Sequence, residues 1–180
     1  MYSDLVSIIT PCYNSADFIA ETIESILAQT YTNWELLITD DCSKDNTIEI
    51  VQSYADKDAR IKVFRLEKNS GGGVARNNSI KQAQGRYIAF CDSDDRWYPN
   101  KLEKQIAFMK QNDCALTCTS YMTCDEAGNI KGILIAPNTI TFKSNLRDCK
   151  IGCLSAIYDT DKVGKVYLPL IRKRQDWGLW

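Results

Sequence analysis

The chain has 180 residues and a mass of 20.4 kDa, with 44% hydrophobic and 25% charged residues, so one soluble globular domain over residues 1–180 is expected. Its formal net charge is −1, from 22 basic and 23 acidic residues, which argues against a nucleic-acid-binding module because such modules carry a basic face. It contains no histidine, which excludes Ser-His-Asp and Cys-His catalysis and histidine-ligated zinc. Acid–base chemistry therefore falls on other side chains, with carboxylates the first candidates.

The cysteines and the apolar runs bear on the cellular location. None of the eight cysteines forms a C-x-x-C pair, and the closest spacings are Cys114-x₃-Cys118 and Cys149-x₃-Cys153. A chain of this length can bury a core without disulfides, so reduced thiols are favoured over a structural zinc. No apolar run approaches the roughly 20 residues of a membrane helix, and the start lacks the features of a signal peptide. We expect a cytoplasmic protein and leave open an association with the inner face of the membrane.

Strands and helices are expected to alternate from the start of the chain. Hydrophobic periodicity predicts strands over residues 5–10, 34–39, 61–66 and 87–91, and helices over residues 18–29, 46–55, 74–84 and 99–112. Gly85 is expected to end the third helix in a left-handed conformation. A fifth strand is expected over 114–121, followed by a hairpin turn at 127–129 that leads into a strand over 130–135. After residue 136 the periodicity is too weak for a prediction.

Four strand–helix units in succession predict an α/β fold with a mostly parallel central sheet and helices on both faces. Ligands of such sheets bind beyond the carboxyl ends of the strands. Polar loops follow the first, second and fourth strands, at Tyr13–Asn14, Asp40–Asp41 and Asp92–Asp95. By this topology the three loops are expected to meet at one edge of the sheet, where they would form a site.

The fourth strand ends in a cluster of acids. Asp92 and Asp94 are two residues apart, so in an extended chain their side chains leave the backbone on the same side. Two carboxylates so placed suit Mg²⁺ or Mn²⁺, which also take oxygen ligands from water and from substrate phosphates. The alternative is an ordinary polar turn, in which Asp and Ser are common residues.

Two further features at strand ends point to a ligand. Asp40 and Asp41 can accept hydrogen bonds from a ribose or a base, although one of them can instead cap the next helix. The glycines at 71–73 precede a helix and permit close approach of an anion, but they match no phosphate-binding motif and also fit a flexible loop. Arg76, expected in the first turn of that helix, opposes the helix dipole and is better explained if an anionic ligand is its partner.

The last residues, Arg172 to Trp180, place two tryptophans after a basic cluster, which is typical of a chain cut short inside a domain. Asp176 lies among cations and indoles and is a candidate general base. The alternative for Asp176 is an exposed helix cap. The cluster of Arg172, Lys173 and Arg174 can meet a phosphate or an anionic lipid, but a solvated face is the simpler interpretation.

Read together and in order, these blocks resemble family-2 glycosyltransferases of the GT-A fold over essentially the whole chain. The motifs that carry the resemblance are Val6 to Asn14, Ser25 to Tyr31, Trp34-Glu35-Leu36, Asp40 to Asp45, Asn69-x-Gly71, Ala75-Arg76-Asn77, Gly85, Tyr87-Ile88 and Asp92-x-Asp94-Asp95. Two residues depart from the family pattern, Ser79 where glycine is usual and Cys91 where an aliphatic residue is usual.

The resemblance implies a Rossmann-like, nucleotide-diphospho-sugar transferase fold and a nucleotide-diphosphate-sugar donor, most often linked to UDP. It also implies inversion at the anomeric carbon and transfer to a hydroxyl of a glycan or lipid-linked acceptor, in polysaccharide or glycolipid synthesis. By position, the donor would be held by Pro11, Tyr13, Asn14, Asp41, Arg76, Asp92 and Ser93. Asp92 and Asp94 would bind Mn²⁺ or Mg²⁺, with Asp94 in direct contact. Asp176 falls at the catalytic base, although Gln175 stands where the family has an acid.

Three alternatives share parts of this pattern. A sugar nucleotidyltransferase requires a glycine-rich basic loop after the first strand, whereas this chain has Pro11 to Asn14 there. A phospho-receiver domain needs its acidic pair after the first strand and about 120 residues, and neither condition is met. A donor-binding domain without activity stays open, because the chain ends four residues after Asp176. Membrane association through a part beyond this chain also stays open.

Overall fold

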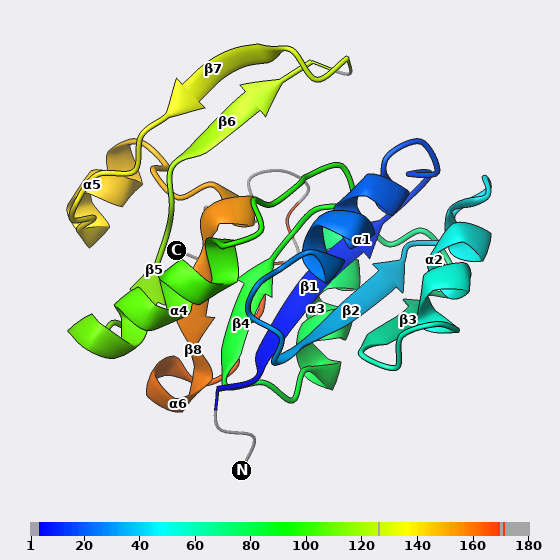
Figure 1. The fold of residues 1–180 in the computed structure, drawn as a ribbon, viewed down its shortest axis with the longest axis horizontal. Coiled ribbons are helices and arrows are strands. Elements are labelled where there is room, and N and C mark those ends of the chain that lie inside the picture. The colour runs from blue at the N-terminus through cyan, green and yellow to red at the C-terminus, as the bar shows by residue number, and fades with distance from the viewer. Residues whose placement is uncertain (1–3, 126, 170, 172–180) are drawn as a thin grey trace.

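A six-stranded mixed sheet forms the centre of the computed structural model, which describes residues 4–125, 127–169 and 171 (Figure 1). The strands lie in the order β3 (Ile61–Arg65), β2 (Trp34–Asp40), β1 (Val6–Cys12), β4 (Tyr87–Phe90), β8 (Ile157–Asp159) and β5 (Leu116–Thr117). The pairs β3–β2, β2–β1 and β1–β4 are parallel, and β8 runs antiparallel to both of its neighbours. The mostly parallel sheet expected from the sequence is confirmed.

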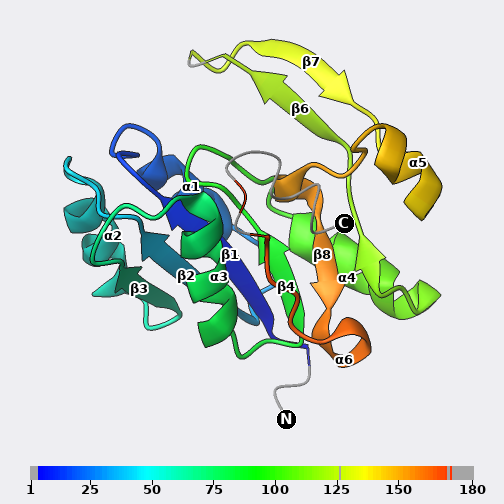
Figure 2. The ribbon, with the colours of Figure 1, turned by 180° about the vertical axis from the view of Figure 1, so that it is seen from behind.

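Helices cover both faces of the sheet. On one face α1 (Ile19–Leu27), α2 (Thr47–Ala55) and α4 (Lys101–Asn112) pack on side chains such as Ile8 and Leu36. The other face is covered by α3 (Gly72–Gln82), as the view from behind shows (Figure 2). This helix packs on Ile9 and Leu37. Every residue of β1 and β2 is buried, as expected of central strands in a sheet covered on both sides.

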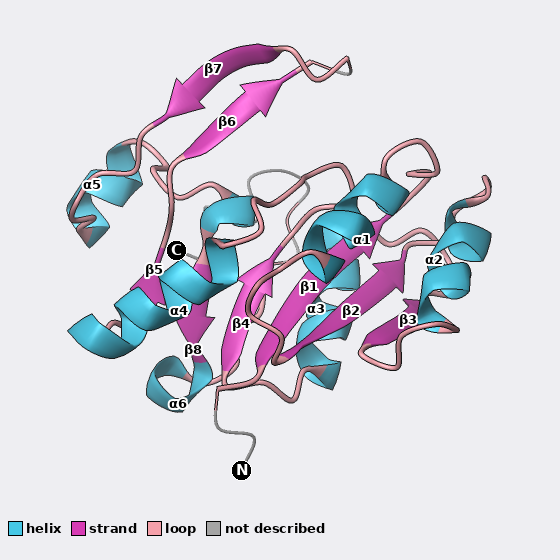
Figure 3. Cartoon of the chain, in the orientation of Figure 1, coloured by secondary structure: helices cyan, strands magenta, loops and turns pink. Residues whose placement is uncertain are grey.

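The fifth strand predicted over 114–121 is confirmed in position, but its predicted length is wrong. The chain forms only the two-residue strand β5 at the sheet edge and then leaves it through Cys118 to Ser120. Strand β6 (Tyr121–Cys124) pairs with β7 (Ile130–Leu134) in a separate hairpin that stands away from the main sheet (Figure 3). The interruption follows from the length of β8, which offers only three residues for pairing. The short helices α5 (Phe142–Arg147) and α6 (Thr160–Val163) and a 3₁₀ turn (Cys153–Ser155) complete the described chain.

The turn between α3 and β4 presses against the start of β1, and Gly85 makes this contact possible. The prediction that Gly85 is left-handed is wrong, because α3 ends at Gln82 and Gly85 is not among the glycines with positive φ. A Cβ atom on Gly85 would lie 2.6 Å from the carbonyl oxygen of Leu5 and 2.7 Å from the nitrogen of Ser7. The Gly85 N–H donates to Ser7 Oγ at 2.8 Å. Glycine is therefore required here for close approach rather than for backbone conformation.

The substitution Gly85→Ala is expected to lower the free energy of unfolding by about 2–3 kcal/mol, because the new methyl group meets backbone atoms that cannot move independently. Chemical denaturation measures this loss. Gly132→Ala, in the hairpin, is the control. A Cβ atom on Gly132 would lie 3.2 Å from Oγ1 of Thr123, which is a side-chain atom rather than a backbone atom. Equal stability of the two variants would contradict the close-approach explanation.

A segment after β8 returns to the sheet and is fastened to α3. Asn77 Nδ2 donates to the carbonyl oxygen of Leu168 at 2.9 Å, and the Leu168 N–H donates to Asn77 Oδ1 at 2.8 Å. Leu168 itself is buried in the core on the α3 side. This pair of bonds fixes Leu168 beside Asn77, which is the residue that follows Arg76 in α3.

The structure bears on the expectations for the cysteines and for membrane helices. All eight cysteines are free, and Cys12 and Cys91 are buried, in agreement with reduced thiols. Among the described residues, no helix has the length and hydropathy needed to cross a bilayer.

Candidate functional site

A pocket of about 360 Å³ lies at the carboxyl ends of β1 and β4. This is the point where the strand order reverses, because β2 and β3 lie on one side of β1 and β4 lies on the other. Its walls contain all the residues that the sequence predicts for the donor and the metal: Pro11, Tyr13, Asn14, Asp41, Arg76, Asp92, Ser93 and Asp94. The pocket also includes Gly72, one of the glycines that the sequence indicates for close approach of an anion, together with Cys12, Ser15 and Phe18, which the sequence does not indicate.

The loop after β1 is held in place by the loop after β2. Asn14 adopts a left-handed conformation with φ of 49°, which asparagine tolerates better than most residues. Its N–H donates to Ser43 Oγ at 2.9 Å, and its Oδ1 accepts from the Lys44 N–H at the same distance. Tyr13 stays 43% exposed at the pocket. The half-exposed ring offers an aromatic surface on which a planar base can stack.

The two acids at the end of β2 have different roles. Asp40 is fully buried, accepts hydrogen bonds from the N–H and the hydroxyl of Ser43, and pairs with Arg65 Nε at 3.3 Å. It therefore closes a turn. Asp41 lines the pocket and accepts the N–H groups of Ser70 and Gly71 at 2.7 Å each.

Neither acid caps α2, whose N-terminal cap is Asn46. The capping alternative is thus wrong for both Asp40 and Asp41. Each oxygen of Asp41 keeps a second lone pair, with which it can accept a further N–H or O–H group from a ligand.

Helix α3 begins two residues earlier than predicted, at Gly72, so Arg76 lies beyond the first turn. Gly71 precedes the helix with φ of 91°, which explains the need for glycine there. The Arg76 guanidinium Nη2 donates to both carboxylate oxygens of Asp92, at 2.6 and 2.7 Å. The sequence predicts an anionic ligand as the partner of Arg76, and this stays a prediction, because the partner that the structure shows is the carboxylate of Asp92. The pair joins α3 to the acidic loop after β4.

The acidic loop concentrates negative charge at the pocket. Asp94 is exposed and, within the described part of the chain, has no hydrogen-bond or ion-pair partner. Burial, followed by the charges of Asp92 and Asp94, raises the pKa of Asp95 to about 7. No group of three or more His, Cys, Asp or Glu side chains suited to a metal occurs among the described residues. The donor set at Asp92 and Asp94 fits Mg²⁺ or Mn²⁺ in a site completed by phosphate oxygens and water.

With this geometry in view, comparison with known proteins identifies the family. Residues 7–157 match the family described as "Glycosyl transferase family 2". The chain belongs to glycosyltransferase family 2. The resemblance seen in the sequence is confirmed, and the domain is that of a glycosyltransferase.

The relatives of this family-2 domain include enzymes of glycan synthesis. TuaG of Bacillus subtilis, whose full name is "Putative teichuronic acid biosynthesis glycosyltransferase TuaG", is 44% identical over 180 residues, which cover 99% of this chain and 71% of TuaG. WfgD of Escherichia coli, named UDP-Glc:alpha-D-GlcNAc-diphosphoundecaprenol beta-1,3-glucosyltransferase, is 43% identical over 176 residues, which cover 98% of this chain and 68% of WfgD.

A solved structure supports the fold of the family-2 domain. The crystal structure of S. aureus TarS 1–349 in complex with UDP has a TM-score of 0.77 and 28% sequence identity, over 96% of this chain and 52% of that one. The chain therefore spans about half the length of the TarS structure that it matches.

The two residues that depart from the family pattern, Ser79 and Cys91, are both buried. Ser79 is buried, and its hydroxyl bonds Thr39 Oγ1 at 2.7 Å and the carbonyl oxygen of Leu37 at 3.1 Å, so the polar group has partners on β2. Cys91 is buried and burial raises the pKa of its thiol.

Asp176 and the basic cluster at 172–174 lie outside the described residues, so their roles stay predictions.

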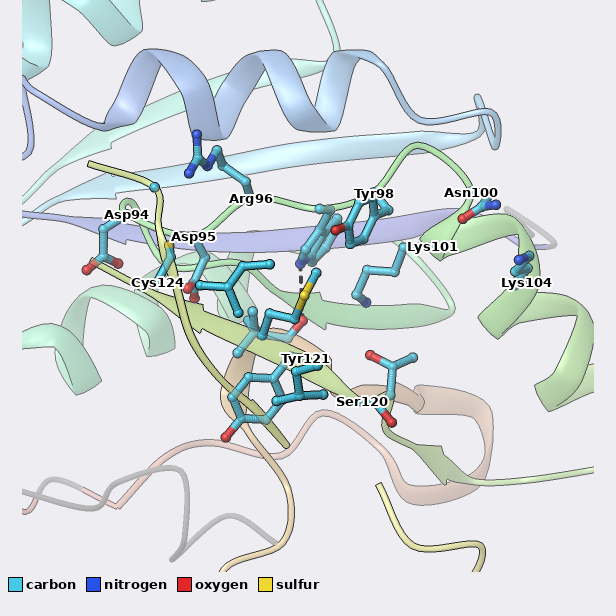
Figure 4. Close-up of a pocket in the computed structure, with 17 residues that line it drawn as sticks. Asp94, Asp95, Arg96, Tyr98, Asn100, Lys101, Lys104, Ser120, Tyr121 and Cys124 are labelled. Carbon is cyan, nitrogen blue, oxygen red and sulfur yellow. Dashed lines mark hydrogen bonds between the residues drawn. The ribbon is translucent and has the colours of Figure 1, made fainter. Parts of the chain in front are cut away.

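The family-2 domain carries a second and larger pocket, of about 680 Å³, which the sequence did not indicate (Figure 4). Its walls come from the loop after β4, from the start of α4 and from the hairpin β6–β7. Asp94 lines both pockets. The signal that could have led to it is a pair of lysines, Lys101 and Lys104, in the first turn of α4 beside Trp97 and Tyr98.

Proposed function

We propose that this domain is the catalytic part of an inverting, metal-dependent glycosyltransferase that moves a sugar from a UDP-sugar to a hydroxyl group of a lipid-linked glycan. The observation that carries the proposal is the first pocket, in which Tyr13, Asp41, Arg76, Asp92 and Asp94 meet. UDP in the related TarS structure supports the choice of donor. The diphosphoundecaprenol in the name of WfgD supports the class of acceptor.

In the proposed donor complex each wall of the pocket has a separate task. The ring of Tyr13 stacks on the base, and Asp41 accepts a hydrogen bond from the base or the ribose. Arg76, the one cation among the described residues that line the pocket, faces the diphosphate while it holds Asp92. Asp92 and Asp94 would hold Mn²⁺ or Mg²⁺, which take carboxylate oxygens as ligands.

The proposed reaction is a single displacement. The acceptor oxygen forms a bond to the anomeric carbon on the face opposite the diphosphate, and the bond from that carbon to the diphosphate oxygen breaks. The proton of the acceptor hydroxyl passes to the carboxylate of Asp176, and UDP leaves with the electron pair of the broken bond. The ion that Asp92 and Asp94 would hold would supply positive charge to offset the negative charge of the leaving diphosphate. The configuration at the anomeric carbon is inverted.

The solubilities of the two proposed substrates bear on where in the cell the reaction occurs. A water-soluble nucleotide sugar and a lipid-linked acceptor can meet only at a membrane surface. We therefore locate the reaction at the cytoplasmic face of the membrane, where the protein would associate peripherally.

A thermal-shift screen of nucleotides and nucleotide sugars tests the proposal. A ligand present at 100 times its Kd and bound only by the folded state adds about 2.7 kcal/mol to the stability. For a domain of this size this raises Tm by about 5–10 °C. UDP and UDP-sugars with Mn²⁺ are expected to give this shift, and Mn²⁺ alone or UDP with EDTA a much smaller one. Equal shifts with CDP and GDP, or none with UDP, would refute a UDP-linked donor.

A further inference from the structure

The second pocket opens beside the proposed donor site, and Asp94 is the residue that joins them. A molecule in the second pocket therefore has one end next to the acidic loop that would hold the diphosphate of the donor. The cavity of about 680 Å³ lies within the range of sites that enclose a small organic molecule. Its position is that of a second substrate rather than of a remote effector.

The charges in the second pocket are separated along its length. Asp94 and Asp95 lie at one end with Arg96, whose guanidinium pairs with Glu21 at 2.6 Å, and Lys101 and Lys104 lie at the other end, together with Asn100 (Figure 4). Both lysines are in the first turn of α4, where a cation opposes the helix dipole. An anion at this end of the pocket would be favoured by the two ammonium groups and by the helix terminus alike.

Lys101 is held so that its charge faces the pocket without an acid beside it. Its Nζ donates to Gln105 Oε1 at 2.9 Å and lies 4.1 Å from the centre of the Trp97 ring. Among the described residues, no carboxylate lies within ion-pair distance of Lys101 or of Lys104. Desolvation lowers the pKa of Lys101 to about 7. A bound phosphate would stabilise the charged form of this lysine.

The remaining wall of the pocket is apolar. The hairpin contributes Met122, Ile130 and Ile133, of which Ile130 and Ile133 are more than 60% exposed. The opposite side includes the ring of Trp97, which is fixed by a hydrogen bond from its Nε1 to the carbonyl oxygen of Leu154 at 3.1 Å. The ligand that fits has a polar end, an anionic group and an apolar extension.

We propose that the second pocket binds the acceptor as a glycosyl diphosphate attached to a lipid. The sugar hydroxyl lies toward Asp94, the diphosphate binds Lys101 and Lys104, and the start of the lipid chain contacts Ile130 and Ile133. This inference rests on the proposed function, because it assigns the second substrate of that reaction. The separation of charges then orients the acceptor, because an acceptor bound in the opposite direction would place its diphosphate against the carboxylates of Asp94 and Asp95.

The test compares the double variant Lys101→Met/Lys104→Met with the wild type in the full-length enzyme. Methionine keeps the apolar stem that packs on Trp97 and removes the charge. With a short-chain alkyl diphospho-N-acetylglucosamine as the acceptor, KM for the acceptor is expected to rise about 10–100-fold, from loss of hydrogen bonds to a charged group. KM for the UDP-sugar is expected to change less than about twofold. An alkyl N-acetylglucosaminide without phosphate should be used equally poorly by both enzymes.

Lys110→Met is the matched control, because Lys110 lies on the same helix but pairs with Asp4 away from the pocket. Its acceptor KM should equal that of the wild type. An unchanged acceptor KM in the double variant would overturn the inference. A rise in KM for the donor alone would also overturn it, and would show that the pocket receives the donor sugar. Absence of transfer by the wild type refutes the proposed function instead, so the two failures are distinguishable.

Discussion

Asp176→Ala is expected to lower turnover about 10²–10⁴-fold while donor affinity stays nearly unchanged, because a general base acts on the proton of the acceptor and not on the nucleotide. The chain has no histidine that could take over this role. Release of UDP in the presence of the acceptor gives kcat for the full-length enzyme. Calorimetric titration with UDP and Mn²⁺ gives the affinity for the nucleotide.

Asp161→Ala is the control for this experiment. Asp161 is an exposed carboxylate in the same part of the sequence, and its side chain pairs with Arg86 at 3.3 Å on the surface. Its kcat should match that of the wild type. A loss of UDP affinity in the Asp176 variant as large as the loss of turnover would remove the assignment of Asp176 as the base.

Asp94→Ala is expected to abolish the metal-dependent part of donor binding. Asp94 is exposed at the pocket, whereas Asp92 is already engaged by Arg76, so Asp94 is the carboxylate available for direct contact with the ion. Titration of UDP into the wild type should show markedly tighter binding with Mn²⁺ than with EDTA. In the variant the two titrations should coincide.

Asp17→Ala is the matched control, since Asp17 is exposed next to the pocket but does not line it. This variant should keep the full difference between Mn²⁺ and EDTA. If the Asp94 variant kept that difference as well, a metal site at the acidic loop would be excluded.

The central part of the fold and the first pocket could be predicted because their signals are local. The buried strand over residues 87–91 and the amphipathic helix that begins near Phe18 have the periodicities of their elements. Once the strands are parallel, topology alone brings the loops that follow them to one edge. The pocket that unites Tyr13, Asp41 and Asp94 follows from this rule, although 81 positions separate the first from the last.

The features that were missed depend on contacts between distant parts of the chain. Strand β8 has three residues, too few for a periodic pattern, and is defined by its pairing with β4 and β5. The end of α3 was misjudged because the reason for Gly85 is the backbone of β1, which no local pattern shows. The second pocket likewise exists only where the hairpin stands over α4, and neither segment indicates the other.

The double hydrogen bond between Asn77 and Leu168 has a consequence for enzyme evolution and engineering. One amide side chain thus tethers the segment around Leu168 to the helix that carries Arg76. Exchanging the C-terminal half for that of another glycosyltransferase, in order to alter acceptor choice, would succeed only if the grafted segment brings its own backbone to the same asparagine.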